Sequence, residues 1–403
     1  MRTTSSVRAK ASPAIQKLQR LGGRPFKRDS IMRQFTSFLW KHRPLQAADD
    51  HQHTVWLFDN TAFQRTPSRS HSGHTHSWYA EVVAVVFEKD SRHDMSALVA
   101  MIADLIGLDG EYGTERDIRH RIAERLQPFL WQTVPGQLMM LELPLPNHTT
   151  LIHQLGPTDH HGLSNQVINT GSRHITDGTT VHSYLRDWSK DVSMETVFAG
   201  PHGWLVLSDI DDTIKYTKTS ESTGILRTTF VDEPRPIAGM PLLYGRIQQA
   251  LQQPVWFYLS ASPYNLYPFL RRFIHSHFTP GTLLLRESSW FDVSELVKSF
   301  TVNTMEYKVE RIKKIRHWFP HRRVLCIGDS TQKDPEAYAE IYKRHPDWIQ
   351  AIWIRKVTDV PYMEARNAPE RFENAFKDVP RRVWRVFEQP HEMDQQVDHI
   401  AAY

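Results

Sequence analysis

The second half of the chain predicts an α/β fold with a parallel sheet that is covered by helices on both faces. From residue 201 onward, apolar runs alternate with amphipathic segments, as in βαβ units; the runs lie at 204–207, 255–259, 282–285, 324–327 and 348–354. They are almost continuously apolar, as expected for strands buried on both faces. Asp209, Ser260 and Asp329 each lie just past one of these runs. Because ligands of such sheets bind at the carboxyl ends of the strands, these three residues are expected to meet.

Helices are expected between the runs, with an apolar face at 266–277 and another at 309–319. We assign residues 201–365 to this catalytic domain. Within it, segment 214–254 is expected to form a small flap or cap over the site. Residues 366–403 are expected to be helical and to pack on the core.

Residues 51–200 predict a β-rich accessory domain, with a sandwich as the candidate arrangement. Strands are expected at 53–59, 78–88, 138–143 and 149–155. Helical periodicity is present at 95–108 and 115–130. The first of these two segments contains Asp104 and is too short to cross a bilayer.

Residues 1–50 form a basic tail that is a candidate for targeting or disorder. Eight basic residues precede the first acidic one, Asp29: Arg2, Arg8, Lys10, Lys17, Arg20, Arg24, Lys27 and Arg28. Three interpretations are open: a solvated tail, a mitochondrial transit peptide and an arm that contacts anionic lipid. The formal net charge of +4 favours anionic partners in general, but no nucleic-acid motif is present. The one cysteine, Cys326, excludes an internal disulfide and is expected in the core.

The strongest motif is the run Asp209-Ile210-Asp211-Asp212-Thr213. Alternation at a strand end would place Asp209 and Asp211 on one side. Asp209 could then attack phosphorus to form an aspartyl-phosphate. Asp211 could protonate the leaving oxygen and later deprotonate water. A calcium-binding or capping loop is the structural alternative.

Three further positions complete the pattern. The Ser260 hydroxyl could donate to a phosphate oxygen, and Lys308, 21 residues before Asp329, could neutralise the phosphate and hold the nucleophile. Asp329 could join Asp209 in holding a hard cation such as Mg²⁺. Asp334 precedes Pro335, so a metal-site role and a helix-capping role stay open for it.

In this order the motifs resemble the DxDxT phosphatases of the haloacid dehalogenase superfamily. The resemblance implies a Rossmann-like core and Mg²⁺ held by Asp209, the backbone carbonyl of Asp211, and Asp329. Asp334 is added as a candidate fourth metal-site residue, and Thr213, Ser260 and Lys308 are the expected phosphate-binding residues.

A closer resemblance, over about 192–360, is to the fungal actin-patch phosphatidate phosphatase family. It is carried by the runs 207–215, Ser260-Ala261-Ser262-Pro263-Tyr264, Gly328-Asp329-Ser330 and Lys333-Asp334-Pro335-Glu336.

This family implies Mg²⁺-dependent hydrolysis of phosphatidate to diacylglycerol, with an anionic phospholipid substrate at a membrane surface. Endocytic or actin-patch proteins are candidate partners, and the expected location is cytoplasmic and peripheral to membranes, or mitochondrial through the basic N-terminus. Two other functions stay open. One is hydrolysis of a soluble phosphoester or phosphoprotein, and the other is a non-catalytic membrane or cytoskeletal adaptor with a phosphatase fold.

Overall fold

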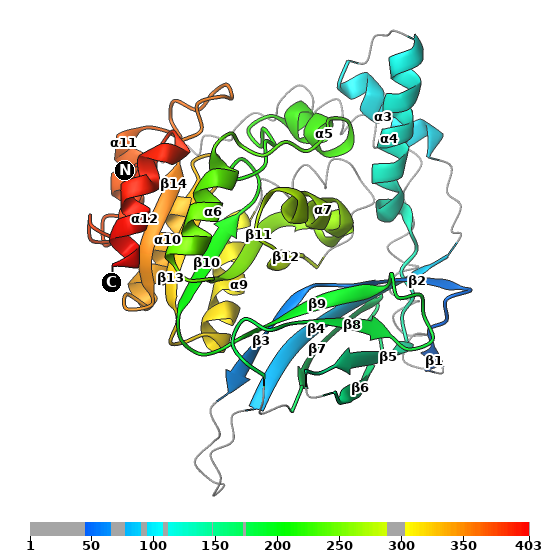
Figure 1. The fold of residues 1–403 in the computed structure, drawn as a ribbon. Coiled ribbons are helices and arrows are strands. Elements are labelled where there is room, and N and C mark those ends of the chain that lie inside the picture. The colour runs from blue at the N-terminus through cyan, green and yellow to red at the C-terminus, as the bar shows by residue number, and fades with distance from the viewer. Residues whose placement is uncertain are drawn as a thin grey trace, which may run out of the picture.

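The computed structural model describes residues 45–65, 77–89, 95–107, 112–146, 148–171, 175–287 and 303–402. Within these ranges the chain is a mixed α/β protein with two sheets (Figure 1). The expectation of an α/β fold is therefore confirmed. The basic stretch up to Asp29 lies outside the described residues, as does most of the predicted tail.

The second half of the chain forms a six-stranded sheet in which every neighbouring pair is parallel. Its strands are β10 (Trp204–Asp209), β11 (Val255–Pro263), β12 (Thr282–Arg286), β13 (Arg323–Asp329), β14 (Ile349–Arg355) and β15 (Trp384–Phe387). Across the sheet they follow the order β12-β11-β10-β13-β14-β15. All five apolar runs predicted as strands are strands here.

Helices cover both faces of this sheet. Successive strand residues point to opposite sides, so neighbouring residues of β10 pack against different helices. Val206 packs in the cluster that includes α5 (Ser222–Phe230), α6 (Met240–Ala250), α7 (Tyr267–His277) and α12 (Asp394–Ala401). Its neighbour Leu207 packs in the cluster that includes α9 (Thr304–Trp318), α10 (Asp334–Arg344) and α11 (Pro369–Ala375). Cys326 lies in this second cluster, fully buried.

Two predictions for this half need correction. The C-terminal segment 366–403 is not only helical, because it contributes β15, which pairs with β14 at the sheet edge; α11, α12 and the 3-10 turn η2 (Pro390–Met393) supply the rest. Segment 214–254 is not all flap, because α6 packs on the sheet through Leu243, Tyr244 and Ile247. Strand β15 spans only four residues, which is too short a run for its pairing with β14 to be evident from local pattern.

The upstream strands are hydrogen-bonded into one nine-stranded sheet, and their arrangement as a sandwich stays a prediction. Its strands are β1 (Gln46–Ala47), β2 (His53–Leu57), β3 (Asn60–Arg65), β4 (Ser77–Glu88), β5 (Gln137–Pro144), β6 (Thr150–Leu155), β7 (Leu163–Asn169), β8 (Thr180–Leu185) and β9 (Ser193–Ala199). Pairing is antiparallel except for β1 with β5 and β3 with β9. Helices α3 (Ser96–Leu105) and α4 (Tyr112–Leu130) follow β4.

The two sheets are joined by buried polar and aromatic contacts. Asp59, just after β2, accepts hydrogen bonds from Arg271 of α7 at 2.5 Å and from the backbone N–H of Glu195 at 2.8 Å. Phe63 of β3 stacks on Trp318 of α9, with ring centroids 5.2 Å apart. The 3-10 turn η1 (Tyr264–Leu266) precedes α7 on this side. Among the helices of the described ranges, none combines the length and the apolarity that a membrane span requires.

Candidate active site

The site lies where the strand order of the parallel sheet reverses. The chain leaves β10 toward β11 on one side, and β13 pairs with β10 on the other side. Asp209 ends β10 and Asp329 ends β13, and the register pairs Ser208 with Ile327. Two neighbouring parallel strands thus present their last residues at one edge, which is the usual ligand position in such sheets.

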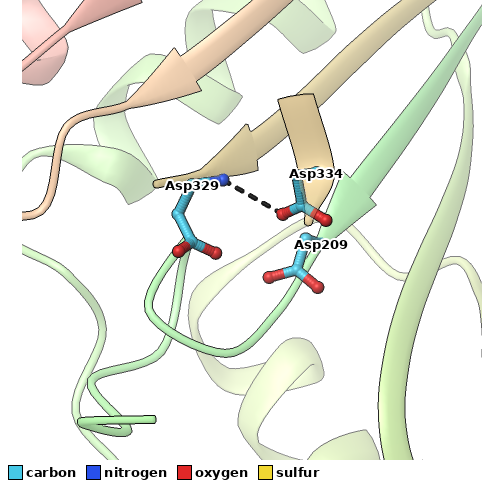
Figure 2. Close-up of side chains that lie close together, drawn as sticks. All are labelled: Asp209, Asp329 and Asp334. Carbon is cyan, nitrogen blue, oxygen red and sulfur yellow. Dashed lines mark hydrogen bonds between the residues drawn. The ribbon is translucent and has the colours of Figure 1, made fainter. Parts of the chain in front are cut away.

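Three carboxylates converge there and are called the acid cluster: Asp209, Asp329 and Asp334 (Figure 2). One carboxylate oxygen from each lies within 4.8 Å of the others. All three residues are at most 1% exposed. The expectation that Asp209 and Asp329 meet at the sheet edge is what the geometry shows.

Asp334 lies in this cluster although it is the first residue of α10. Its Oδ2 accepts a hydrogen bond from the backbone N–H of Asp329 at 3.1 Å (Figure 2), and its Oδ1 contacts the Lys308 ammonium. No side-chain cap hydrogen bond is present at the start of α10. Of the two roles left open for Asp334, its position in the acid cluster supports the metal-site role.

Lys308 of α9 is the cation of the site. Its Nζ donates to Asp209 Oδ1 at 2.6 Å, and the side chain is completely buried. Three ionised carboxylates facing one ammonium leave a net charge of −2, which a divalent cation would balance. Oxygen ligands alone suit a hard ion such as Mg²⁺.

Burial and mutual repulsion perturb these groups strongly. Burial raises the pKa of Asp209 well above its usual value, although Lys308 opposes the shift. Burial, together with the neighbouring Asp334 carboxylate, raises the pKa of Asp329 to about 7. Burial alone would lower the pKa of Lys308, but the Asp209 and Asp334 carboxylates reverse this and raise it. Lys308 therefore stays charged, whereas burial makes the ionised forms of Asp209 and Asp329 less favourable.

Thr213 bridges two members of the cluster. Its hydroxyl lies 2.9 Å from Asp209 Oδ2 and 3.1 Å from Asp329 Oδ2. Thr331 donates its backbone N–H to Asp329 Oδ1 at 2.5 Å, and its hydroxyl contacts the same oxygen. Sequence reasoning missed Thr331. It lies two residues past Asp329, where short side chains commonly bond back to the turn.

Asp211 is buried and is held by its own set of hydrogen bonds. Its Oδ2 accepts from Ser260 at 2.6 Å and from Ser262 at 3.3 Å. Its Oδ1 accepts from Thr217 at 2.9 Å and lies 3.5 Å from the Lys215 ammonium. Strand β10 ends at Asp209, so strand alternation does not reach Asp211, and the placement of both carboxylates on one side stays a prediction. The metal role expected through its backbone carbonyl stays a prediction, as do the phosphate roles of Ser260 and Thr213.

Asp212 organises the residues that follow the motif. It adopts φ +62°, and its carboxylate accepts backbone N–H groups from Thr217, Lys218 and Thr219 at 2.7–2.9 Å. These bonds fix segment 215–219 against Asp212. The contacts of Lys215, Thr217 and Thr219 were not expected, because no sequence pattern points to them.

Comparison with known proteins agrees with this geometry. Residues 204–356 match the family model described as Phosphatidate phosphatase APP1, catalytic domain. The phosphatidate phosphatase APP1 of Saccharomyces cerevisiae is 29% identical over 254 residues, which cover 59% of this chain and 42% of the yeast protein. An uncharacterized protein of Schizosaccharomyces pombe is 27% identical over 161 residues, which cover 39% of this chain and 26% of that protein.

The matched region thus spans less than half the length of either curated relative. Among solved structures, a carbohydrate esterase aligns with a TM-score of 0.20 at 8% identity. The alignment covers 76% of this chain and 90% of the esterase chain, but the similarity is too low to support an argument. The family match covers the strands β10, β11, β12 and β13 and reaches the end of β14, together with all three members of the acid cluster. Residues 204–356 of this chain are therefore similar to the catalytic domain of APP1-type phosphatidate phosphatases.

Proposed function

We propose that this chain is a Mg²⁺-dependent phosphatidate phosphatase that uses Asp209 as its nucleophile. The observation that carries the proposal is the acid cluster, in which three buried carboxylates surround one buried ammonium. Burying charges in this way is costly for folding. Such groupings are more common at catalytic centres than in purely structural cores.

We assign the parallel sheet to a Rossmann-like core of the haloacid dehalogenase type. In chain order its strands lie 3-2-1-4-5-6 across the sheet, which is the order of doubly wound folds. Asp209, Asp329 and Asp334 would hold the Mg²⁺, with the Asp211 backbone carbonyl as a further ligand. When bound, the ion would neutralise charge on the transferring phosphoryl group and fix its orientation.

The other catalytic roles would belong to side chains of the site. Asp209 would attack phosphorus and form an aspartyl-phosphate. Lys308, which donates to Asp209, would orient the nucleophile and neutralise phosphate charge. Asp211 would protonate the leaving oxygen and then deprotonate the attacking water, oriented by its bonds to Ser260 and Thr217. Thr213 and Ser260 would donate to phosphate oxygens.

The substrate is proposed from the family rather than from the site. The yeast relative is a phosphatidate phosphatase, so phosphatidate at a membrane surface is the leading substrate, with peripheral membrane contact. Location stays a prediction, either cytoplasmic or mitochondrial, and so do endocytic or actin-patch partners. A soluble phosphoester or a phosphoprotein is the alternative substrate.

Turnover on a panel of phosphoesters tests this proposal. We expect release of phosphate from phosphatidate in detergent micelles, faster than from soluble esters, and loss of turnover in chelator. Asp209→Asn should lower kcat about 10⁴-fold or more with an unchanged fold, whereas Asp378→Asn, an exposed carboxylate far from the cluster in sequence, should leave kcat intact. An active Asp209→Asn variant would defeat the assignment. Vesicle binding without turnover on the whole panel would favour the adaptor alternative.

A further inference from the structure

A polar cavity of about 630 Å³ lies against segment 215–219, on the face opposite the acids. Burial alternates along this segment. Lys215, Thr217 and Thr219 are buried toward Asp211 and Asp212. Tyr216 and Lys218 are half-buried and line the cavity, whose other walls come from α4, α5 and the residues after α5.

Basic side chains dominate two walls of this α4–α5 cavity. Four line it: Arg121, Lys218, Arg227 and Arg235. Two of them are paired with acids of the same cavity. Arg227 Nε lies 3.3 Å from Asp232, and Arg121 Nε lies 3.4 Å from Glu233. The third acid that lines the cavity is Glu221.

The other two basic groups are held by an aromatic ring instead. The Lys218 ammonium lies 5.5 Å and the Arg235 guanidinium 5.6 Å from the centroid of Tyr216. A cation–π contact positions a cation through its charge and leaves its N–H donors available for a ligand. Lys218 and Arg235 therefore both contact Tyr216 and keep N–H donors available for a ligand.

The first turn of α5 also lines the cavity. Thr223 and Gly224 line the cavity, and the first N–H groups of a helix have no intrahelical acceptor. Gly224 is needed for the close approach, because a Cβ there would lie 2.6 Å from Lys218 Cβ. Lys218 adopts φ +57°, held by the Asp212 carboxylate at 2.7 Å and by the N–H of Glu221 on its carbonyl at 3.0 Å. A strained lysine and a helix N-terminus thus face one cavity.

We propose that the α4–α5 cavity binds a phosphoryl anion through Lys218, Arg235 and the first turn of α5. An ammonium, a guanidinium and helix N–H groups are the donor set that phosphate prefers. A single phosphoryl group occupies only part of 630 Å³, so the cavity has room for the glycerol portion of a phospholipid headgroup. The source of the anion is either such a headgroup or free phosphate. The inference does not require the acid cluster to be catalytic.

Binding measured in chelator tests the proposal without turnover. The first arm is co-sedimentation with phosphatidylcholine vesicles doped with phosphatidylglycerol, a phosphodiester lipid. The second arm is calorimetric titration with inorganic phosphate. The cavity variant is Lys218→Gln/Arg235→Gln. The matched control is Lys377→Gln/Arg382→Gln, which removes the same charge from exposed positions near α11 and β15.

We expect the cavity variant to bind its ligand about 25-fold more weakly than wild type, at about fivefold per basic residue, and the control to change less than threefold. A loss confined to vesicles identifies a lipid headgroup as the ligand. A loss in the phosphate titration identifies free phosphate. Equal binding by wild type and cavity variant in both arms, or equal losses in cavity and control variants, would overturn the proposal. Thermal melting of each variant establishes that it is folded.

Discussion

Replacing Lys308 by Met is the sharpest test of the electrostatics of the site. The ammonium is completely buried and contacts Asp209 and Asp334. Met has a similar length and no charge, so the substitution leaves three buried carboxylates without a cation. Removing one partner of a buried ion pair costs about 3–5 kcal/mol of unfolding free energy. We expect a loss of this size at pH 8 in chelator.

The loss should depend on pH. Protonation of Asp209 and Asp329 removes most of the uncompensated charge, and the pKa values of both are already raised in the wild type. At pH 5 the folded variant binds protons that the unfolded chain has partly released, so its stability rises as pH falls. The deficit should therefore shrink to about half or less at pH 5. Saturating Mg²⁺ should recover about 2–3 kcal/mol at pH 8, because the ion binds only the folded cluster.

Urea unfolding at pH 5 and pH 8, with chelator or with Mg²⁺, measures these quantities. Lys313→Met is the control on the same helix, because Lys313 pairs with Glu310 at the surface. The Lys313–Glu310 pair should contribute less than about 1 kcal/mol to the unfolding free energy. A Lys308→Met variant within 1 kcal/mol of wild type at pH 8, or one equally destabilised at both pH values, would refute the reasoning.

Three further results are expected. In chelator, the unfolding free energy of wild type minus that of Asp329→Asn should fall by about 4 kcal/mol from pH 4 to pH 8. The reason is that the pKa of Asp329 is raised to about 7 in the folded state, which keeps a proton that the unfolded state has lost. Urea unfolding across this range measures the difference, and a difference that does not change with pH would contradict the raised pKa. Gly328→Ala should lower Mg²⁺ affinity at least about tenfold in calorimetry. The added Cβ would lie 2.6 Å from Asp334 Oδ2 and displace this carboxylate from the acid cluster. A Gly328→Ala variant that binds Mg²⁺ as tightly as wild type would show that Asp334 is not a metal-site residue. Asp59→Ala should lower the unfolding free energy by about 2–3 kcal/mol, because Arg271 loses the Asp59 carboxylate as its partner between the two sheets. Calorimetric melting measures this loss. An unchanged melting temperature would mean that the Arg271–Asp59 contact does not stabilise the protein.

Much of the catalytic half could be read from local pattern. Each predicted apolar run became a buried strand, because a residue between two helix layers must be apolar on both faces. Asp209 and Asp329 were found by the same reasoning, since a polar residue at the end of such a strand lies at the ligand-binding edge. The nine-stranded sheet was harder. Its strands β3, β7, β8 and β9 mix polar and apolar residues, so their pairing depends on neighbours that lie far along the chain.

The sequence alone determined the periodicity of the strands, the positions of the acids at strand ends and the resemblance of about 192–360 to a phosphatidate phosphatase family. Only the tertiary structure decided which acids share a site. Asp334 could equally have capped α10, and its carboxylate turns inward because Lys308 on α9 and the N–H of Asp329 offer it buried partners. Asp211 is held instead by hydrogen bonds from Ser260 and Thr217. Such choices follow from contacts between segments distant along the chain, and local periodicity carries no information about those contacts.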